Sequence, residues 1–105
     1  MAYKIVWTEY ATQDLQSLLE YIEQDSLNAA KDLAILINEK VISLEKMPYR
    51  GRVLPEFFYP PLRELIIGNY RLIYEIKGKR IIIHGIIHGS RDLLQMWENG
   101  ERFLY

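Results

Sequence analysis

The first half of the chain combines one alternating segment with two segments of helical periodicity. Residues 3–7 alternate between two sides, as a strand does, and residues 9–24 repeat apolar side chains every three or four positions, as an amphipathic helix does. Thr8 stands where the N-cap of this helix belongs. The acids expected on its outer face are Asp14, Glu20 and Glu23. The pattern therefore predicts a short strand that leads directly into a helix.

A second helix is predicted after a short interruption at Asp25 and Ser26. Ser26 can cap this helix, and Pro48 is expected to stop it. Its apolar positions are Ala30, Leu33, Ala34, Ile37, Val41 and Leu44, and Ile35, Leu36 and Ile42 widen the stripe. A short link between two amphipathic helices predicts an antiparallel hairpin, and the wide stripe indicates contact with more than one neighbour.

The second half of the chain has the pattern of a loop, three strands and a short helix. Residues 49–61 contain three prolines, which cannot donate to a strand ladder, so no central strand is expected there. The predicted strands are residues 62–67, 70–77 and 80–88, with turns at Gly68-Asn69 and Gly78-Lys79. Ser90 is a candidate N-cap for a final helix that carries Leu93, Leu94, Met96 and Trp97 and ends at Gly100.

Together these elements predict one α+β domain over residues 1–105. The antiparallel two-helix hairpin must bury its stripe, so it is expected to pack on a mainly antiparallel sheet that the three-stranded meander completes. The N-terminal strand is expected at an edge of the sheet or beside the last strand, and a short C-terminal helix follows. On the last strand, Ile81, Ile83 and Ile87 are expected to share one face with Gly85 among them, and Ile82, His84, Ile86 and His88 the other.

Composition narrows the classes of function. Half of the 105 residues are hydrophobic and none is cysteine, which excludes a disulfide framework and a thiolate metal site and fits a reducing compartment. The N-terminus lacks the apolar stretch of a signal peptide, and no apolar run approaches the length of a membrane span. We therefore expect a cytoplasmic protein with no membrane partner.

The net charge of -1 conceals an asymmetry between the two halves. Residues 1–48 have a balance of -4, whereas residues 49–92 have a balance of +4 that comes mostly from arginine. Two solvated faces of opposite sign are one interpretation. The other is a basic surface on the second half, because the planar arginine fork suits phosphate or carboxylate recognition.

The order of elements, taken with particular residues, resembles the RelE/ParE superfamily of bacterial type II toxins. The most specific block is LRELIIGNYRLIYEI followed by IIIHGIIHGSRDL, and KIVWT, DSLNAAKDL and LEKMPYRGR add to it. The resemblance covers nearly the whole chain. The resemblance implies a toxin with a cognate antitoxin. The antitoxin would form a hetero-oligomer with the toxin and neutralise it by covering the working surface of the toxin.

The resemblance leaves two activities open, because one scaffold carries both. ParE-like members poison DNA gyrase and need no catalytic residue, whereas RelE-like members cut messenger RNA on the ribosome. A sequence pI near 6.1 is unfavourable for docking on ribosomal RNA, where phosphate contacts dominate affinity. The long helices, of which the first is acidic outside, also resemble the ParE branch. We therefore favour a gyrase target, with the endoribonuclease as the alternative. No cofactor is expected in either case.

The endoribonuclease alternative has a definite candidate catalytic set. His88 would transfer protons, and Arg63, Arg71 and Arg91 would stabilise the phosphate. The structural interpretation is that these arginines pair with Glu64, Glu75, Asp92 or other carboxylates. His84 lies among isoleucines and is expected to be a hydrogen-bonded core residue, and two histidines are too few for a zinc site. The candidate antitoxin contacts are Trp7, Phe57, Phe58 and Tyr59.

Overall fold

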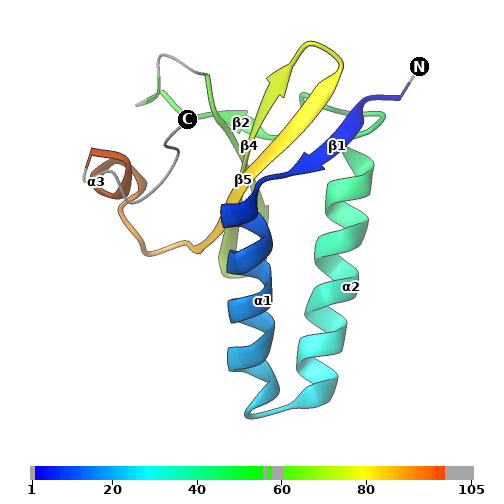
Figure 1. Ribbon diagram of the computed structural model, residues 1–105, viewed down its shortest axis with the longest axis vertical. Helices are drawn as coiled ribbons and strands as arrows, with labels where there is room; N and C mark the ends of the chain where they lie inside the picture. The colour runs from blue at the N-terminus through cyan, green and yellow to red at the C-terminus, as the bar shows by residue number, and fades with distance from the viewer. Residues whose placement is uncertain (1, 56, 58–60, 99–105) are drawn as a thin grey trace.

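The computed structural model describes residues 2–55, 57 and 61–98; Phe58, Tyr59 and Gly100 lie outside them. The elements are β1 (Lys4–Trp7), α1 (Glu9–Glu23), α2 (Leu27–Ser43), β2 (Arg52–Val53), β3 (Arg63–Ile67), β4 (Tyr70–Lys77), β5 (Arg80–His88) and α3 (Leu93–Glu98). Figure 1 shows α1 and α2 side by side, with their connection at the bottom and the β4–β5 turn at the top. The predicted α+β fold is confirmed. No helix in the described part of the chain is long and apolar enough to cross a membrane.

The sheet has five strands in the order β1-β5-β4-β3-β2. β1 pairs in parallel with β5, and the other pairings are antiparallel, so the first strand occupies an edge beside the last strand, as predicted. The two-residue strand β2 inside the proline-rich loop was not predicted. It pairs Arg52 with Glu64 and Val53 with Arg63 at the opposite edge. A strand of two residues is too short to produce a periodic signal, and an edge is where nearby prolines are tolerated.

The two predicted helix caps are present, but the end of α2 differs from the prediction. The Thr8 hydroxyl accepts from the Ala11 N–H at 3.1 Å and donates to the Ile83 carbonyl at 3.0 Å, which ties the start of α1 to β5. Ser26 accepts from the Ala29 N–H at 3.0 Å. α2 ends at Ser43, well before Pro48. The turn that follows is held by the segment just before β1, because the Tyr3 N–H donates to the Glu45 carbonyl at 3.0 Å.

The sheet buries apolar side chains on both of its faces. The helix-side core contains Ala11, Ile37, Val41, Leu44, Leu65, Ile67, Leu72, Tyr74, Ile81, Ile83 and Ile86. A second, smaller core contains Leu54, Phe57, Leu62, Ile73, Ile87, Leu93 and Met96. Leu54, Phe57, Leu62 and α3 therefore pack on the face opposite the helical hairpin and help to position the end of β5.

A β-bulge in β5 changes the face on which its side chains lie. Ile73 pairs with Gly85 but Tyr74 pairs with Ile83, so His84 is an extra residue without a partner on β4. Ile81 and Ile83 face the helix-side core as predicted, whereas Ile87 belongs to the second core and Ile86 to the first. The predicted common face for Ile81, Ile83 and Ile87 is wrong, because strict alternation does not continue through a bulge.

Next to the bulge, a side chain of α1 accepts a hydrogen bond from a backbone N–H of β5. The Asp14 carboxylate accepts a hydrogen bond from the Ile86 N–H at 3.0 Å. The sequence pattern placed Asp14 on the outer, acidic face of α1, and this is wrong: its side chain is half-buried against β5. His84 is 2 % exposed and lies 2.9 Å from a Glu75 carboxylate oxygen, so its predicted role as a hydrogen-bonded core residue is confirmed. Burial lowers the pKa of His84, although Glu75 acts in the opposite direction.

The Tyr74 hydroxyl anchors the loop that follows α2. This hydroxyl accepts from the Gly51 N–H at 2.9 Å and donates to the Pro48 carbonyl at 2.8 Å, and the side chain is fully buried. A Cβ at Gly51 would lie 2.6 Å from the same hydroxyl oxygen, so the loop packs directly against the ring. Tyr74 thereby fixes the position of the loop that leads into β2 and Arg52.

We expect Tyr74→Phe to destabilise the protein by about 1–3 kcal/mol, because it leaves a buried donor and a buried acceptor without a partner. Urea denaturation of the two proteins measures this difference. Tyr21→Phe is the matched control, since Tyr21 is exposed on α1 and its hydroxyl faces solvent; a change within about 0.5 kcal/mol is expected there. Equal stability of Tyr74→Phe and the parent protein would contradict the anchoring role.

Candidate functional site

A hollow of about 570 Å³ lies where β3 and β5 end and β4 begins. We call it the arginine hollow. Its lining residues are Arg52, Glu64, Ile66, Gly68, Asn69, Tyr70, Arg71, His88, Gly89 and Ser90. These residues come from β2, the β3–β4 hairpin and the end of β5, so the sheet edge and the second core position them together.

Glu64 is the electrostatic centre of the arginine hollow. One of its oxygens accepts from Arg52 Nε at 2.6 Å and the other from Arg71 Nε at 2.5 Å. The Glu64 side chain is only 4 % exposed, and Arg71 is 15 % exposed, whereas Arg52 at 67 % is largely in solvent. Strand register produces this arrangement, because Arg52 is directly opposite Glu64, and Arg71 is opposite Ile66, on the same face as Glu64.

The pKa of Glu64 reflects a balance between burial and the two arginines. Burial raises the pKa of this carboxyl, but the hydrogen bonds and positive charges of Arg71 and Arg52 outweigh it and hold the pKa below the ordinary value. Glu64 is therefore ionised at neutral pH. Both arginines of the hollow already share one carboxylate, which reduces the positive charge available to a bound phosphate.

His88 stands at the rim of the hollow with its orientation fixed by its neighbours. Its Nδ1 lies 2.8 Å from the Ser90 hydroxyl and accepts from the Ser90 N–H at 3.2 Å. The neutral ring therefore carries its proton on Nε2. The ring packs edge-on against Tyr70, with centroids 5.7 Å apart at 89°. Ser90 was predicted to cap α3, but Asp92 does so by accepting from the Gln95 N–H at 3.0 Å.

The structure brings together two of the four candidate catalytic residues, His88 and Arg71, which both line the hollow. Arg71 Nη1 also donates to the backbone carbonyl of Arg91 at 3.3 Å, but Arg91 is not among the residues that line the hollow. Arg63 lies elsewhere: it pairs with Tyr74, roughly 13 Å along β4 from the residue opposite His88, and points to the other face of the sheet.

Arg63 is held in place by the loop that follows α2. Its Nη1 donates to the Gly51 carbonyl at 2.7 Å, and its guanidinium stacks over the Tyr49 ring at 5.0 Å from the centroid. These contacts fasten the same loop that Tyr74 anchors from the core. Its position thus favours a structural role for Arg63.

The candidate antitoxin contacts are not grouped in the described part of the chain. Trp7 is half-buried and packs against the helix-side core, and Phe57 is buried in the second core on the opposite face. Phe58 and Tyr59 lie outside the described residues. Within those residues no three His, Asp or Glu side chains gather in a way that could hold a metal ion.

Comparison with known proteins places this geometry in a family. Residues 5–93 match the model of the ParE toxin of the type II toxin-antitoxin system parDE. The chain belongs to the ParE toxin family. The toxin RelE2 of Caulobacter vibrioides is 33 % identical over 89 residues, which cover 84 % of this chain and 97 % of that protein. The chain is thus a type II toxin of the RelE/ParE superfamily, and its relatives carry the names of both branches.

Two solved structures share the fold of this ParE family member. The chromosomal ParDE system of Pseudomonas aeruginosa has a TM-score of 0.68 at 24 % identity, over 83 % of this chain and 96 % of that one. The toxin-antitoxin complex RelBE2 of Mycobacterium tuberculosis has a TM-score of 0.55 at 25 % identity, over 84 % and 99 %. The resemblance inferred from the sequence motifs is therefore confirmed.

Sequence reasoning did not identify Glu64 as the centre of the site. The pairing of Glu64 with an arginine was among the structural interpretations, and it is correct for Arg71. Arg52 was not expected to join them, because its position depends on the unpredicted strand β2. The available signal was that Glu64 alternates with the apolar Leu65 along the strand, which places the carboxylate on the face of the sheet opposite the helical hairpin.

We expect Glu64→Gln to lower the free energy of unfolding by about 1.5–3 kcal/mol at pH 7, mainly through the shielded Arg71, since exposed Arg52 contributes little. The pKa of Glu64 is lowered in the folded state, so this stabilisation is present above pH 4.5 and is lost as the pH falls through the folded-state pKa. Denaturant titrations between neutral and acidic pH should show the difference between parent and variant narrowing below pH 4.5.

The control is Glu39→Gln, an exposed position on α2, for which no pH-dependent difference of this kind is expected. A difference between parent protein and Glu64→Gln that stays constant into acid would refute the ionic origin of the stabilisation.

Proposed function

We propose that this ParE family toxin arrests growth by binding DNA gyrase and that a cognate antitoxin neutralises it in a hetero-oligomeric complex. The observation that carries the choice of target is the position of Glu64 between Arg52 and Arg71. Cleavage of RNA requires a cation that stabilises charge developing at the scissile phosphate. In the arginine hollow both guanidinium groups are already bound to the Glu64 carboxylate, where a phosphate would have to bind. Arg63 points to the other face of the sheet.

A binding mode of action needs no such cation. The family model over residues 5–93 is that of ParE, and the sequence pI of 6.1 is unfavourable for a protein that must dock on ribosomal RNA. These observations support a toxin that acts by occupying a protein target. Catalytic residues are not required for that function.

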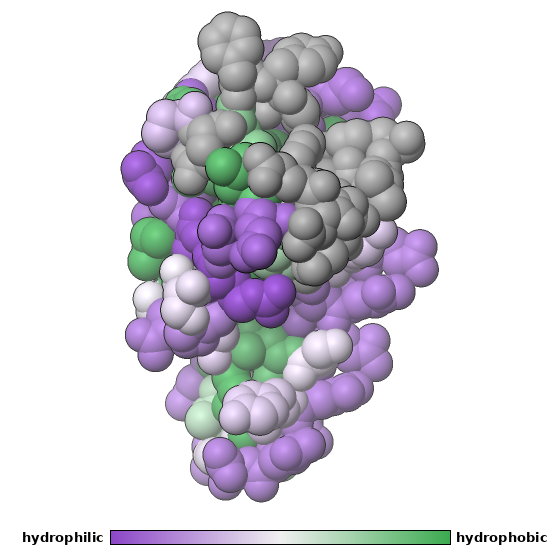
Figure 2. Space-filling view, turned by 90° about the vertical axis from the view of Figure 1, so that its left-hand side faces the viewer, coloured by the Kyte–Doolittle hydropathy of each residue, from purple (hydrophilic) through white to green (hydrophobic). Residues whose placement is uncertain are grey.

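Exposed apolar side chains on the helical hairpin support the antitoxin as a partner. Leu27, Ile35 and Ile42 are exposed on α2, and Tyr21 is exposed on α1. Figure 2 shows apolar residues reaching the surface on the lower part of the molecule, which is formed by the hairpin. Apolar surface of this kind is characteristic of protein contacts. The two structural neighbours are themselves described as a ParDE system and a RelBE2 toxin-antitoxin complex.

The endoribonuclease is the second candidate, and three residues of the hollow favour it. His88, Tyr70 and Arg71 lie together, and the contact of His88 Nδ1 with Ser90 leaves Nε2 as the ring nitrogen for proton transfer. The relative from Caulobacter vibrioides also bears the name RelE2. The two candidates differ in whether His88 is essential.

We expect the purified toxin to inhibit supercoiling by gyrase, and His88→Ala to inhibit it within about threefold of the parent protein. A ribonuclease that used His88 for proton transfer would lose about 10²–10⁴-fold in the rate of messenger cleavage on translating ribosomes. Both activities are measured for the same two proteins. Asn69→Ser is the control, because it alters the hollow without removing a group that transfers protons at neutral pH.

Messenger cleavage by the parent protein that disappears in His88→Ala, together with uninhibited gyrase, would replace the gyrase proposal by the ribonuclease. Gyrase inhibition by both proteins with intact messages supports the proposal.

A further inference from the structure

Three basic residues form a row across the sheet at the end remote from the arginine hollow. Lys4 on β1 pairs with Arg80 on β5, and Arg80 pairs with Lys77 on β4. Their neighbours Ile5, Ile81 and Ile76 all pack into the helix-side core. Because side chains alternate along a strand, the three cations point to the opposite face, which the helical hairpin does not cover.

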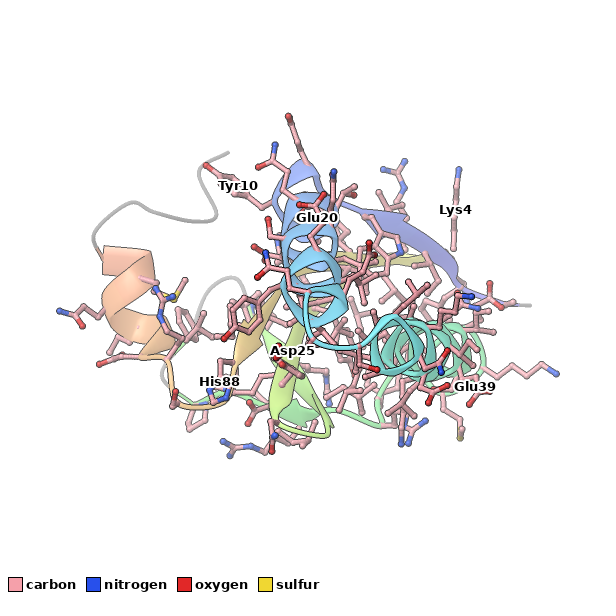
Figure 3. The ribbon with its side chains drawn as sticks, turned by 90° about the horizontal axis from the view of Figure 1, so that it is seen from below. Lys4, Tyr10, Glu20, Asp25, Glu39 and His88 are labelled. Carbon is pink, nitrogen blue, oxygen red and sulfur yellow. The ribbon has the colours of Figure 1, made fainter. Side chains whose placement is uncertain are left out.

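We call these three residues, Lys4, Lys77 and Arg80, the basic row. All three are exposed. In the described part of the chain the salt bridges involve none of them. Lys79 in the β4–β5 turn is not part of the row, because its Nζ lies 5.0 Å from the centroid of the Tyr3 ring, which packs on the helix side. Figure 3 shows Lys4 and His88 on opposite sides of the molecule, so the basic row is separate from the arginine hollow.

The position of these like charges opposite one another lowers the stability of the sheet. Like charges directly opposite each other on neighbouring strands destabilise a sheet, and here Arg80 has a cation opposite it on both sides. Neighbouring strands are about 4.8 Å apart, so the three charges span about 10 Å. A polyanion laid across the strands would neutralise all of them at once.

The charge of the molecule is also polarised toward the row. Glu20, Glu23 and Asp25 lie at or near the α1–α2 connection, which Figure 1 places at the end opposite the β4–β5 turn. The net charge is only -1, so the separation of charge along the molecule decides how a polyanion approaches. It would orient the basic row toward the ligand during encounter.

We infer that the basic row is a binding site for the phosphate backbone of duplex DNA. Proteins that bind single strands stack bases on exposed aromatic rings, but Tyr3, an aromatic residue that the described part of the chain places beside this row, is half-buried and covered by Lys79. Lysine and arginine side chains without a base-reading partner make contacts that are independent of sequence. A duplex therefore fits the row better than an RNA or DNA single strand does.

Binding of the purified full-length chain to a short, labelled duplex of arbitrary sequence tests this site by fluorescence anisotropy. Three phosphate contacts predict that log K falls with log salt concentration with a slope of about -3. The double variant Lys77→Gln, Arg80→Gln should bind about tenfold more weakly or worse at about 50 mM salt, with a slope smaller in magnitude by about 2.

The matched control is Lys31→Gln, Lys40→Gln, which removes the same charge from α2 and should bind like the parent protein. Equal weakening of both double variants would show that net charge alone is responsible and would overturn the site. Tighter binding to a single strand of the same sequence, or more effective competition by polyglutamate than by unlabelled duplex, would also overturn the assignment to duplex DNA. Thermal melting of each variant establishes that it is folded.

This test is independent of the proposed target, because the binding reaction contains no gyrase. Loss of the DNA interaction would leave gyrase inhibition to be judged by its own assay, and failure of gyrase inhibition would leave a measured DNA interaction in place. If both hold, the row is expected to contact the DNA on which gyrase acts.

Discussion

The bulge at His84 is the constraint on which the arrangement of this protein depends. One extra residue in β5 transfers Ile86 to the helix-side core and Ile87 to the second core. A single strand thereby supplies buried side chains to both faces of the sheet. Two carboxylates stabilise the bulge. Asp14 on α1 accepts a hydrogen bond from the Ile86 N–H, and a Glu75 oxygen is hydrogen-bonded to Nε2 of the buried His84 ring. Without the bulge, the last residues of β5 would present the opposite faces.

This switch of face gives the two ends of the sheet different chemistry. At the end where β5 finishes, the second core, β2 and the β3–β4 hairpin assemble a hollow in which one carboxylate holds two arginines. At the other end, Lys4, Arg80 and Lys77 lie opposite one another on three strands, and the salt bridges in the described part of the chain involve none of them. The charge asymmetry of the sequence is therefore real in space, but the basic half of the chain is divided between a partly neutralised site and an exposed one.

The difference between these two groups of cations matters for how a toxin of this superfamily acts. A shared scaffold supports both gyrase poisons and ribonucleases, so fold does not distinguish them. A ribonuclease needs positive charge that is free to stabilise its transition state, whereas a toxin that acts by binding alone does not. In the arginine hollow Arg71 is mostly shielded from water and bound to Glu64, which favours a structural role for that cluster. The helical hairpin, with its exposed apolar residues, has the character of a surface for protein contacts.

Local patterns in the sequence determined the elements and their order. Thr8 and Ser26 specify helix starts through short-range hydrogen bonds, and the apolar stripes of α1 and α2 specify a hairpin. The same is true of the buried role of His84, since a histidine among isoleucines must find a hydrogen-bond partner. The family motifs, which are strings of neighbouring residues, likewise identified the superfamily.

Tertiary structure decided the features that depend on pairing between distant segments. The short strand β2 exists only because Arg52 and Val53 meet β3, and the turn that follows the end of α2 at Ser43 is bound by Tyr3, the residue before β1. Asp14 turned inward because the bulge leaves the Ile86 N–H for it. Glu64 became the partner of two arginines through register between three strands. Periodicity reports how each segment is solvated but contains no information on register, so the site and the bulge appear only when the strands are placed side by side.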